Sequence, residues 1–151
     1  WIKSYESKDF YTWAIARKED EGNVIGSISV PQLNQKAGRV TVGYCLGRNW
    51  WGHKIMKEAF AELIRFFFEV EGANRVEALH DTRNVNSGKV MAACGLKKEG
   101  TLRRYGWNNQ GICDECIYGM VASDYFEGKQ RWENKLGKQE IEGYVWTAGY
   151  R

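Results

Sequence analysis

The sequence lacks any apolar run long enough to cross a membrane. The longest run, Leu63 to Phe68, is interrupted by Arg65, whereas a spanning helix needs about 20 apolar residues in succession. A signal peptide is also missing at the start of the sequence. We therefore expect a cytoplasmic protein that has no membrane partner.

A strong charge of either sign is missing too. The chain has 22 Lys and Arg residues against 19 Asp and Glu residues, which gives a formal net charge of +3. This value is too small to indicate a nucleic-acid-binding domain. We expect no nucleic-acid partner, although a mildly basic surface suits a phosphorylated ligand.

Cysteine is present, but not in a metal-binding pattern. Cys113 and Cys116 form a single C-x-x-C, without the second pair or nearby histidines that a zinc site requires. In a strand, a three-residue offset points two side chains to opposite faces. We expect these two residues, together with Cys45 and Cys94, to be reduced structural thiols in core elements, and we expect no metal.

The length of 151 residues suits a single domain with its own hydrophobic core. Aromatic residues make up 14% of the chain, which indicates broad contact surfaces within the fold or between subunits. A homodimer is therefore a possible assembly.

The clearest positive signal is a strand, a turn and a helix in succession. Residues 39–46 (RVTVGYCL) are rich in β-branched and aromatic residues, which is typical of a strand. From residue 55 to 67, apolar residues recur at helical spacing, which predicts a helix that ends near Gly72. The first N–H groups of such a helix are unpaired, so a turn that exposes them forms an anion site. The alternative is that Gly52 simply turns the chain before a core helix.

Weaker patterns predict the remaining elements. Strands at residues 10–17 and 24–30 should form a hairpin around a Gly22–Asn23 turn, with Pro31 ending the second strand. A strand at residues 75–80, after the long helix, implies parallel pairing with the strand at 39–46. Further expected elements are a helix at residues 88–94 capped by Asn86 or Ser87, strands at 96–107 and 113–121, a helix from Ser123 to Leu136, and a tail at 141–150 that forms a strand or an ordered extension.

Three segments, in order, carry a family resemblance. They are VGYCLGRNWWGHKIMKEA (42–59), NVNSGKVMAACGLKKEGTLR (84–103), and Asp114 to Tyr118 with Asp124 beyond. They resemble conserved blocks of the GNAT superfamily of acyl-CoA-dependent N-acetyltransferases, and most of all the branch of the ribosomal-protein N-terminal (alanine/serine) acetyltransferases. The resemblance covers residues 10–125, with residues 126–151 as a C-terminal extension of one GNAT-like domain spanning residues 1–151.

The resemblance implies an α/β (α+β) fold with a mixed, mostly antiparallel central sheet flanked by helices. The sheet would splay open between the 39–46 and 75–80 strands. The strand and helices that normally open the GNAT fold have no counterpart in the sequence, and the C-terminal tail is a candidate to fill their space.

The resemblance also implies acetyl-CoA as co-substrate. The backbone of residues 44–46 would pair with the pantetheine arm, and the amides of residues 51–56 would hold the pyrophosphate. The implied cofactor-binding residues are Tyr44, Cys45, Leu46, Asn49, Trp51, Gly52, His53, Lys54, Ile55, Met56, Asn84 and Ser87.

Several positions depart from the family pattern. In the superfamily turn Q/R-x-x-G-x-G/A, Asn49 takes the first place and Lys54 takes the last glycine or alanine. A side chain at Lys54 would crowd the phosphates if its φ is positive, and would help to hold them if it is helical. Met91 stands where many relatives have a tyrosine that acts as general acid. Thr41 stands where some relatives have a glutamate that acts as general base.

The catalytic candidates are therefore Tyr118 as an acid, His80 as a base, and Ser87 at the thiol end. A packing role for Tyr118 and a structural role for His80 are the alternatives. The function implied is transfer of an acetyl group to a primary amine, either a protein N-terminus or a small molecule. The alternatives are a non-catalytic acyl-CoA-binding or regulatory module on the same fold and, less favoured, an RNA-associated protein.

Overall fold

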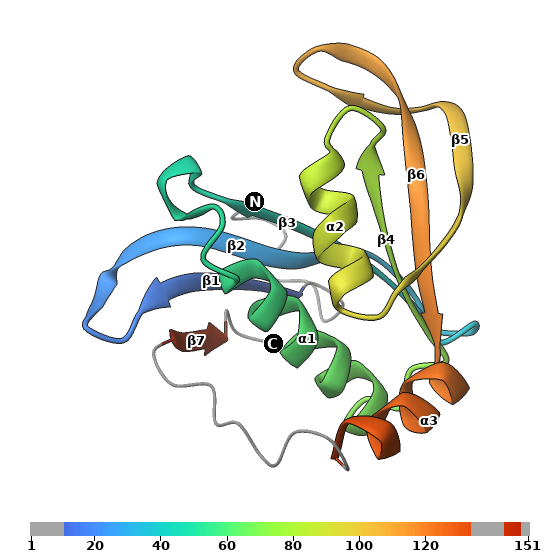
Figure 1. Cartoon of the computed structure of the whole chain (residues 1–151), viewed down its shortest axis with the longest axis horizontal. Helices are drawn as coiled ribbons and strands as arrows, with labels where there is room; N and C mark the ends of the chain where they lie inside the picture. Colours follow the sequence, from blue (N-terminus) through green and yellow to red (C-terminus); the bar gives the residue numbers. More distant parts are fainter. Residues whose placement is uncertain (1–10, 134–143, 149–151) are drawn as a thin grey trace.

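The computed structural model describes residues 11–133 and 144–148 (Figure 1). The elements are β1 (Tyr11–Arg17), β2 (Asp20–Asn34), β3 (Arg39–Leu46), the short 3-10 helix η2 (Arg48–Trp50), α1 (Ile55–Glu69), β4 (Arg75–Asp81), α2 (Val85–Ala93), β5 (Lys97–Asn108), β6 (Gly111–Val121), α3 (Ala122–Glu133) and β7 (Tyr144–Ala148).

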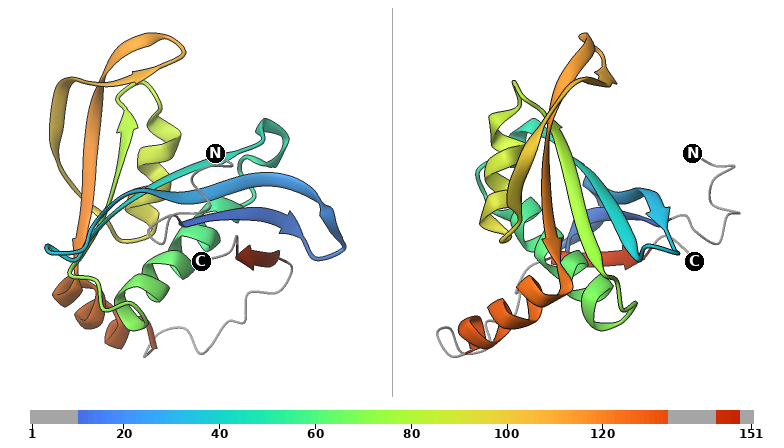
Figure 2. Two further views of the ribbon diagram at one scale, coloured as in Figure 1. Left: turned by 180° about the vertical axis from the view of Figure 1, so that it is seen from behind. Right: turned by 90° about the vertical axis from the view of Figure 1, so that its right-hand side faces the viewer.

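The seven described strands form one sheet in the order β5-β6-β4-β3-β2-β1-β7. Among them, only β3 and β4 pair in parallel, and every other neighbouring pair is antiparallel. Figures 1 and 2 show α1 and α2 side by side on one face of this sheet. The predicted mixed, mostly antiparallel sheet flanked by helices is thus confirmed.

The helix α1 supplies most of the core. Its apolar stripe buries eight residues against the sheet, namely Ile55, Met56, Ala59, Phe60, Leu63, Ile64, Phe67 and Phe68. Because α1 connects two adjacent parallel strands, its buried face lies over Val40, Val42, Val76 and Ala78, which belong to the same core cluster. The predicted strand, turn and helix are confirmed.

The sheet opens immediately beyond a short zone of parallel pairing. The β3–β4 register begins at Arg39↔Arg75 and ends at Val42↔Ala78. Both strands continue past that point, β3 to Leu46 and β4 to Asp81, without pairing to each other. This is the predicted splay.

A polar network ties the strands together at the paired end of the splay. The Thr41 hydroxyl donates to Glu77 Oε1 at 3.0 Å, and Arg75 Nε donates to Glu77 Oε2 at 2.8 Å. Arg75 Nη1 also donates to Glu99 Oε1 on β5, at 3.0 Å, and this ion pair lowers the pKa of Glu99. A Cβ at Gly119 would lie 2.5 Å from Arg75 Nη2, so the guanidinium crosses directly over β6.

Two sequence predictions about the first hairpin are wrong. The turn lies at residues 18–19 rather than at Gly22–Asn23, because β2 begins at Asp20 and pairs with Arg17. Pro31 does not end β2, which continues to Asn34. A register shift between Ser29 and Gln32 accommodates the proline, which has no N–H to give to the ladder.

The predicted start of α2 is also wrong. Asn84, rather than Asn86 or Ser87, is the N-cap, and its side-chain oxygen accepts from the Ser87 N–H at 3.3 Å. The helix therefore begins at Val85. Asn84, predicted to contact the cofactor, holds the first turn of α2.

The C-terminal predictions are met in part. α3 spans Ala122–Glu133, so the last three residues of the predicted helix lie outside the described residues. From the predicted 141–150 tail, residues 144–148 form β7, which pairs antiparallel with β1 at the sheet edge. The other residues of that tail lie outside the described ranges.

The network at the splay yields a stability prediction. Arg75→Met leaves the buried Glu77 carboxylate without its nearest cation, so we expect the free energy of unfolding to fall by about 3 kcal/mol. Urea unfolding measures this loss. The control, Glu99→Gln, removes the exposed partner of the same arginine and should cost about 1 kcal/mol or less. Equal losses in both variants would contradict a central role for Glu77.

Candidate functional site

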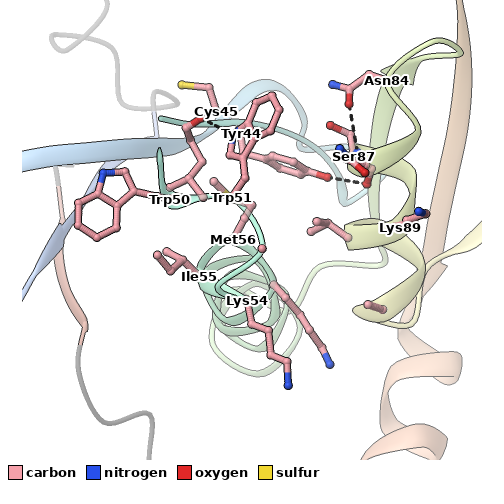
Figure 3. A pocket seen from close by; sticks show the side chains of 16 residues that line it. Tyr44, Cys45, Trp50, Trp51, Lys54, Ile55, Met56, Asn84, Ser87 and Lys89 are labelled. Carbon is pink, nitrogen blue, oxygen red and sulfur yellow. Dashed lines mark hydrogen bonds between the residues drawn. The ribbon is translucent and has the colours of Figure 1, made fainter. Parts of the chain in front are cut away.

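A cavity of about 550 Å³ lies where the sheet splays open (Figure 3). Its walls are the unpaired end of β3, the loop that follows, the first turn of α1 and one face of α2. The cavity therefore joins an open strand edge to the N-termini of two helices.

The loop between β3 and α1 contains two left-handed residues. Gly52 has φ +82°, and Lys54, the N-cap of α1, has φ +63°. The positive φ at Lys54 is the case in which its side chain is predicted to crowd a bound phosphate. The Lys54 side chain makes no cap hydrogen bond, since an ammonium has no acceptor for the N–H groups of the helix. The first N–H groups of α1 face a cavity lined by Lys54, Ile55 and Met56.

Three lysines surround the cavity. Lys54 and Lys57 come from the start of α1, and Lys89 comes from α2. Within the described part of the chain, none of the three forms an ion pair. Their charge adds to the positive end of the α1 dipole, so the cavity favours a ligand with more than one negative charge.

The open edge of β3 presents peptide groups of alternate residues. Gly26 lies opposite Leu46, yet the hydrogen bond runs from Gly47 N–H to the Ile25 carbonyl, at 2.8 Å. Gly26 and Leu46 are therefore a non-hydrogen-bonded pair, and the peptide groups of Leu46 point away from β2. By the same alternation, Tyr44 faces the gap and Cys45 faces β2. Of the three residues predicted to pair with pantetheine, the register directs Tyr44 and Leu46 into the gap.

A tyrosine connects the two sides of the cavity. The Tyr44 hydroxyl donates to the Ser87 carbonyl on α2 at 3.0 Å, and its ring lies 5.5 Å from that of Phe60 on α1. Burial raises the pKa of Tyr44 well above its usual value. The hydroxyl thus stays protonated and holds α2 at a fixed distance from β3.

The three catalytic candidates lie in two places. Ser87 lines the cavity, whereas His80 and Tyr118 do not. Their rings are 5.6 Å apart under α2, where a Cβ at Gly88 would lie 2.7 Å from His80 Nε2 and 3.3 Å from the Tyr118 hydroxyl. The backbone of α2 at Gly88 thus packs onto this pair.

The tautomer of His80 follows from its contacts. Its Nδ1 lies 2.7 Å from the Asp81 carbonyl oxygen, which can only accept, so Nδ1 carries the proton. Nε2 then holds a lone pair, and among the described residues it is buried without a hydrogen-bond partner. His80 is only 8% exposed, which agrees with the structural alternative more closely than with a base open to substrate.

Most of the predicted cofactor residues meet at the cavity. Asn49 and His53 do not line it. The predicted residues that do are Tyr44, Cys45, Leu46, Trp51, Gly52, Lys54, Ile55, Met56, Asn84 and Ser87. The lining residues missed by the sequence prediction are Lys57, Asn86, Lys89, Val90 and Ala93.

Helical spacing was the signal for the missed residues on α2. Asn86, Lys89, Val90 and Ala93 recur at steps of three and four, so they share one face of the helix. Placing the start of α2 at Gly88 hid this pattern, because it left Asn86 outside the helix.

Thr41 has an acidic neighbour that the sequence prediction also missed. Glu77 lies directly opposite Thr41 on the next strand and accepts a hydrogen bond from its hydroxyl. Arg75 holds the other carboxylate oxygen, and Arg39 Nε lies 3.6 Å from Glu77 Oε1. With both oxygens engaged, Glu77 stabilises the sheet rather than presenting a free base.

Comparison with known proteins agrees with this fold. Residues 1–97 match the family model described as an acetyltransferase (GNAT) domain. The chain therefore belongs to the GNAT acetyltransferase family.

Three known proteins illustrate the similarity. The chain is 33% identical over 111 residues to an uncharacterized N-acetyltransferase, p20, of Bacillus licheniformis, covering 74% of this chain and 61% of that protein. It matches the ribosomal-protein-S5-alanine acetyltransferase of Vibrio fischeri with a TM-score of 0.72 and 25% identity, over 82% and 68% of the two chains. The microcin C7 self-immunity acetyltransferase, solved with acetyl-CoA and AMP, matches with a TM-score of 0.61 and 26% identity, over 66% and 55%.

These matches place the chain near the ribosomal-protein branch of the family, as predicted from the motifs. The chain spans about six-tenths of the length of the curated relatives it matches first. Among the described helices, none is both long and apolar enough to cross a membrane. The described residues also contain no group of three or more His, Cys, Asp and Glu side chains able to hold a metal ion.

The conformation of Lys54 yields a second prediction. A left-handed backbone costs a residue with a Cβ about 1 kcal/mol, and glycine avoids this cost. We expect Lys54→Gly to raise the free energy of unfolding by about 0.5–1 kcal/mol, partly offset by the freer unfolded chain. Lys54→Ala, which keeps the Cβ, should give no gain. Equal stabilities of the two variants in urea unfolding would show that φ at this position carries no strain.

The four cysteines yield a third prediction. All four are free, and Cys45 alone is exposed, contrary to its expected core position, because its side chain lies on the face opposite the helices, beside Ser27. Burial raises the pKa of Cys94 to about 12. We expect Ellman's reagent at pH 8 to modify one thiol rapidly in the native chain, and Cys45→Ser to abolish that phase. Two rapid thiols would contradict the burial of Cys94, Cys113 and Cys116.

Proposed function

We propose that this chain transfers an acetyl group from acetyl-CoA to a primary amine. The observation that carries the proposal is the shared cavity, in which an open strand edge and an exposed helix N-terminus face the same space. A thioester on a long amide-containing arm with a pyrophosphate needs both features. Membership of the GNAT family and a relative solved with acetyl-CoA support the choice of co-substrate.

The residues around the cavity fit the coenzyme from one end to the other. The pyrophosphate would be held by the first amides of α1, which the left-handed turn at Gly52 and Lys54 exposes, with the Cβ of Lys54 narrowing the space beside it. Lys57 and Lys89 would meet the remaining phosphate charge. This assignment explains why three lysines gather at one cavity.

The pantetheine arm would run along the open edge of β3. The peptide groups of Tyr44 and Leu46 point into the gap, where they can pair with amides as an added strand does. Asn84 and Ser87 then mark the thioester end. In this proposal Cys45 makes no backbone pairing, and its side chain lies beside Ser27 on the other face of the sheet.

The chemistry proposed is direct attack of the amine nitrogen on the thioester carbonyl. The carbon–sulfur bond breaks, the coenzyme leaves as a thiol, and the ammonium proton must be removed before attack. Ser87 is the catalytic candidate in the cavity. Tyr118 and His80 remain in the proposal only as groups that support the first turns of α2, since Gly88 packs onto both.

We further propose that the chain forms a single domain in a reducing, cytoplasmic environment. One core cluster joins α1 to strands β1, β2, β3, β4 and β6, and all four cysteines are free. Homodimer formation, an acceptor that is a protein N-terminus or a small-molecule amine, and the lack of a nucleic-acid partner stay as predictions from the sequence.

A charge substitution at Gly52 tests the phosphate site. A Cβ at Gly52 would meet no other atom within 4 Å, and both Asp and Asn tolerate the left-handed backbone found there. We expect Gly52→Asp to weaken acetyl-CoA binding about tenfold to a hundredfold relative to Gly52→Asn, because a carboxylate repels the pyrophosphate. Titration calorimetry measures both variants. Equal affinities of the two variants for acetyl-CoA would show that this turn does not bind the pyrophosphate.

An assay of free-thiol release from acetyl-CoA tests the reaction. The unsubstituted chain is mixed with acetyl-CoA and each member of a panel of amines and N-terminal peptides. Amine-dependent thiol release is expected. Binding of acetyl-CoA without turnover of any acceptor would favour the non-catalytic module, and absence of binding would overturn the proposed function.

A further inference from the structure

The carbonyl group that faces the gap at the end of β3 already has a partner. Trp51 Nε1 donates to the Leu46 carbonyl oxygen at 2.8 Å. Both residues line the cavity, and Figure 3 shows Trp51 folded against the end of β3. An indole N–H thus occupies the acceptor that the strand register directs away from β2.

This contact conflicts with a ligand that pairs along β3. A carbonyl on an open strand edge accepts readily from an amide N–H of a ligand lying in the gap. While the indole N–H is bound to Leu46, that position is satisfied and the ring covers the same end of the cavity. The ligand and the indole therefore compete for one oxygen.

The Trp51 side chain can rotate away from Leu46 without disturbing the core. Its side chain is 52% exposed and lies outside the core cluster, so rotating it opens no buried hole. Besides the Leu46 bond, its ring is held by Arg48, whose guanidinium carbon lies 5.7 Å from the ring centroid. A cation–π contact at an exposed position is weak, and it can persist while the indole turns.

We propose that Trp51 is a positioning residue that closes the open edge of β3 when the cavity is empty and releases Leu46 when acyl-CoA binds. This inference rests on the proposed function, because it takes the pantetheine arm as the competing ligand. Trp51 keeps the Leu46 carbonyl satisfied in the free chain, and its displacement reduces the affinity for the ligand.

Trp51→Phe tests the competition, since phenylalanine keeps an aromatic ring and removes the N–H. The variant should bind acetyl-CoA about two- to tenfold more tightly, the factor that one net hydrogen bond represents. The matched control is Trp107→Phe, the same substitution at a 65% exposed position on β5, which should leave the affinity unchanged. Unchanged affinity in Trp51→Phe would overturn the inference. Weaker binding would also overturn it, because the N–H would then be donating to the ligand.

Proton–nitrogen NMR of the full chain provides a second readout. The seven tryptophans each give an indole N–H signal, and the signal lost in Trp51→Phe identifies Trp51. Saturating acetyl-CoA should move this signal toward the position of exposed indoles and speed its exchange with solvent. If calorimetry shows binding of acetyl-CoA while the Trp51 indole signal stays in place, the inference is overturned and the proposed function is not. Absence of binding heat in both the original chain and Trp51→Phe would overturn the proposed function together with it.

Discussion

The contact between Thr41, Glu77 and Arg75 is the constraint on which the site depends. Parallel pairing of β3 and β4 extends over only four residue pairs, so the sheet must be held firmly where it is closed. Thr41 and Arg75 occupy the two oxygens of the buried Glu77 carboxylate, and the same guanidinium crosses β6 to reach Glu99. Four strands are thereby joined on the face opposite the helices. With that end fixed, the unpaired ends of β3 and β4 can separate and leave room for a cavity.

Lys54 shows how the loop after β3 combines two requirements. The loop must turn sharply enough to aim the first amides of α1 at the cavity, which a left-handed residue at the N-cap achieves. Glycine would meet this requirement without strain, but it would bring no charge. Lysine accepts about 1 kcal/mol of backbone strain and brings a positive charge to the cavity wall. The departure from the family's glycine or alanine therefore adds a positive charge to the loop and leaves the turn intact.

The sequence predicted the long, regular features well and the local ones poorly. β3 and β4 lie within a residue of their expected bounds, because burial imposes a clear periodicity over many residues. The long helix α1 ends at Glu69, three residues before its expected end at Gly72. The cap of α2 was misplaced because Asn84, Asn86 and Ser87 are all good capping residues, and only the chain path decides which oxygen reaches a free N–H. For the site, sequence order placed His80 and Tyr118 near the cleft. It did not reveal that Gly88 of α2 would pack over both.

An open strand edge inside a sheet creates a problem of its own, since unpaired peptide groups attract any free strand. Here side chains of the same chain address the problem from both directions. Tyr44 reaches across to the Ser87 carbonyl and fixes the width of the gap, while Trp51 satisfies the Leu46 carbonyl at its end. The Tyr44 contact is partly buried, and the Trp51 contact is exposed. This difference in burial separates the part of the site that keeps its shape from the part that can exchange with a ligand.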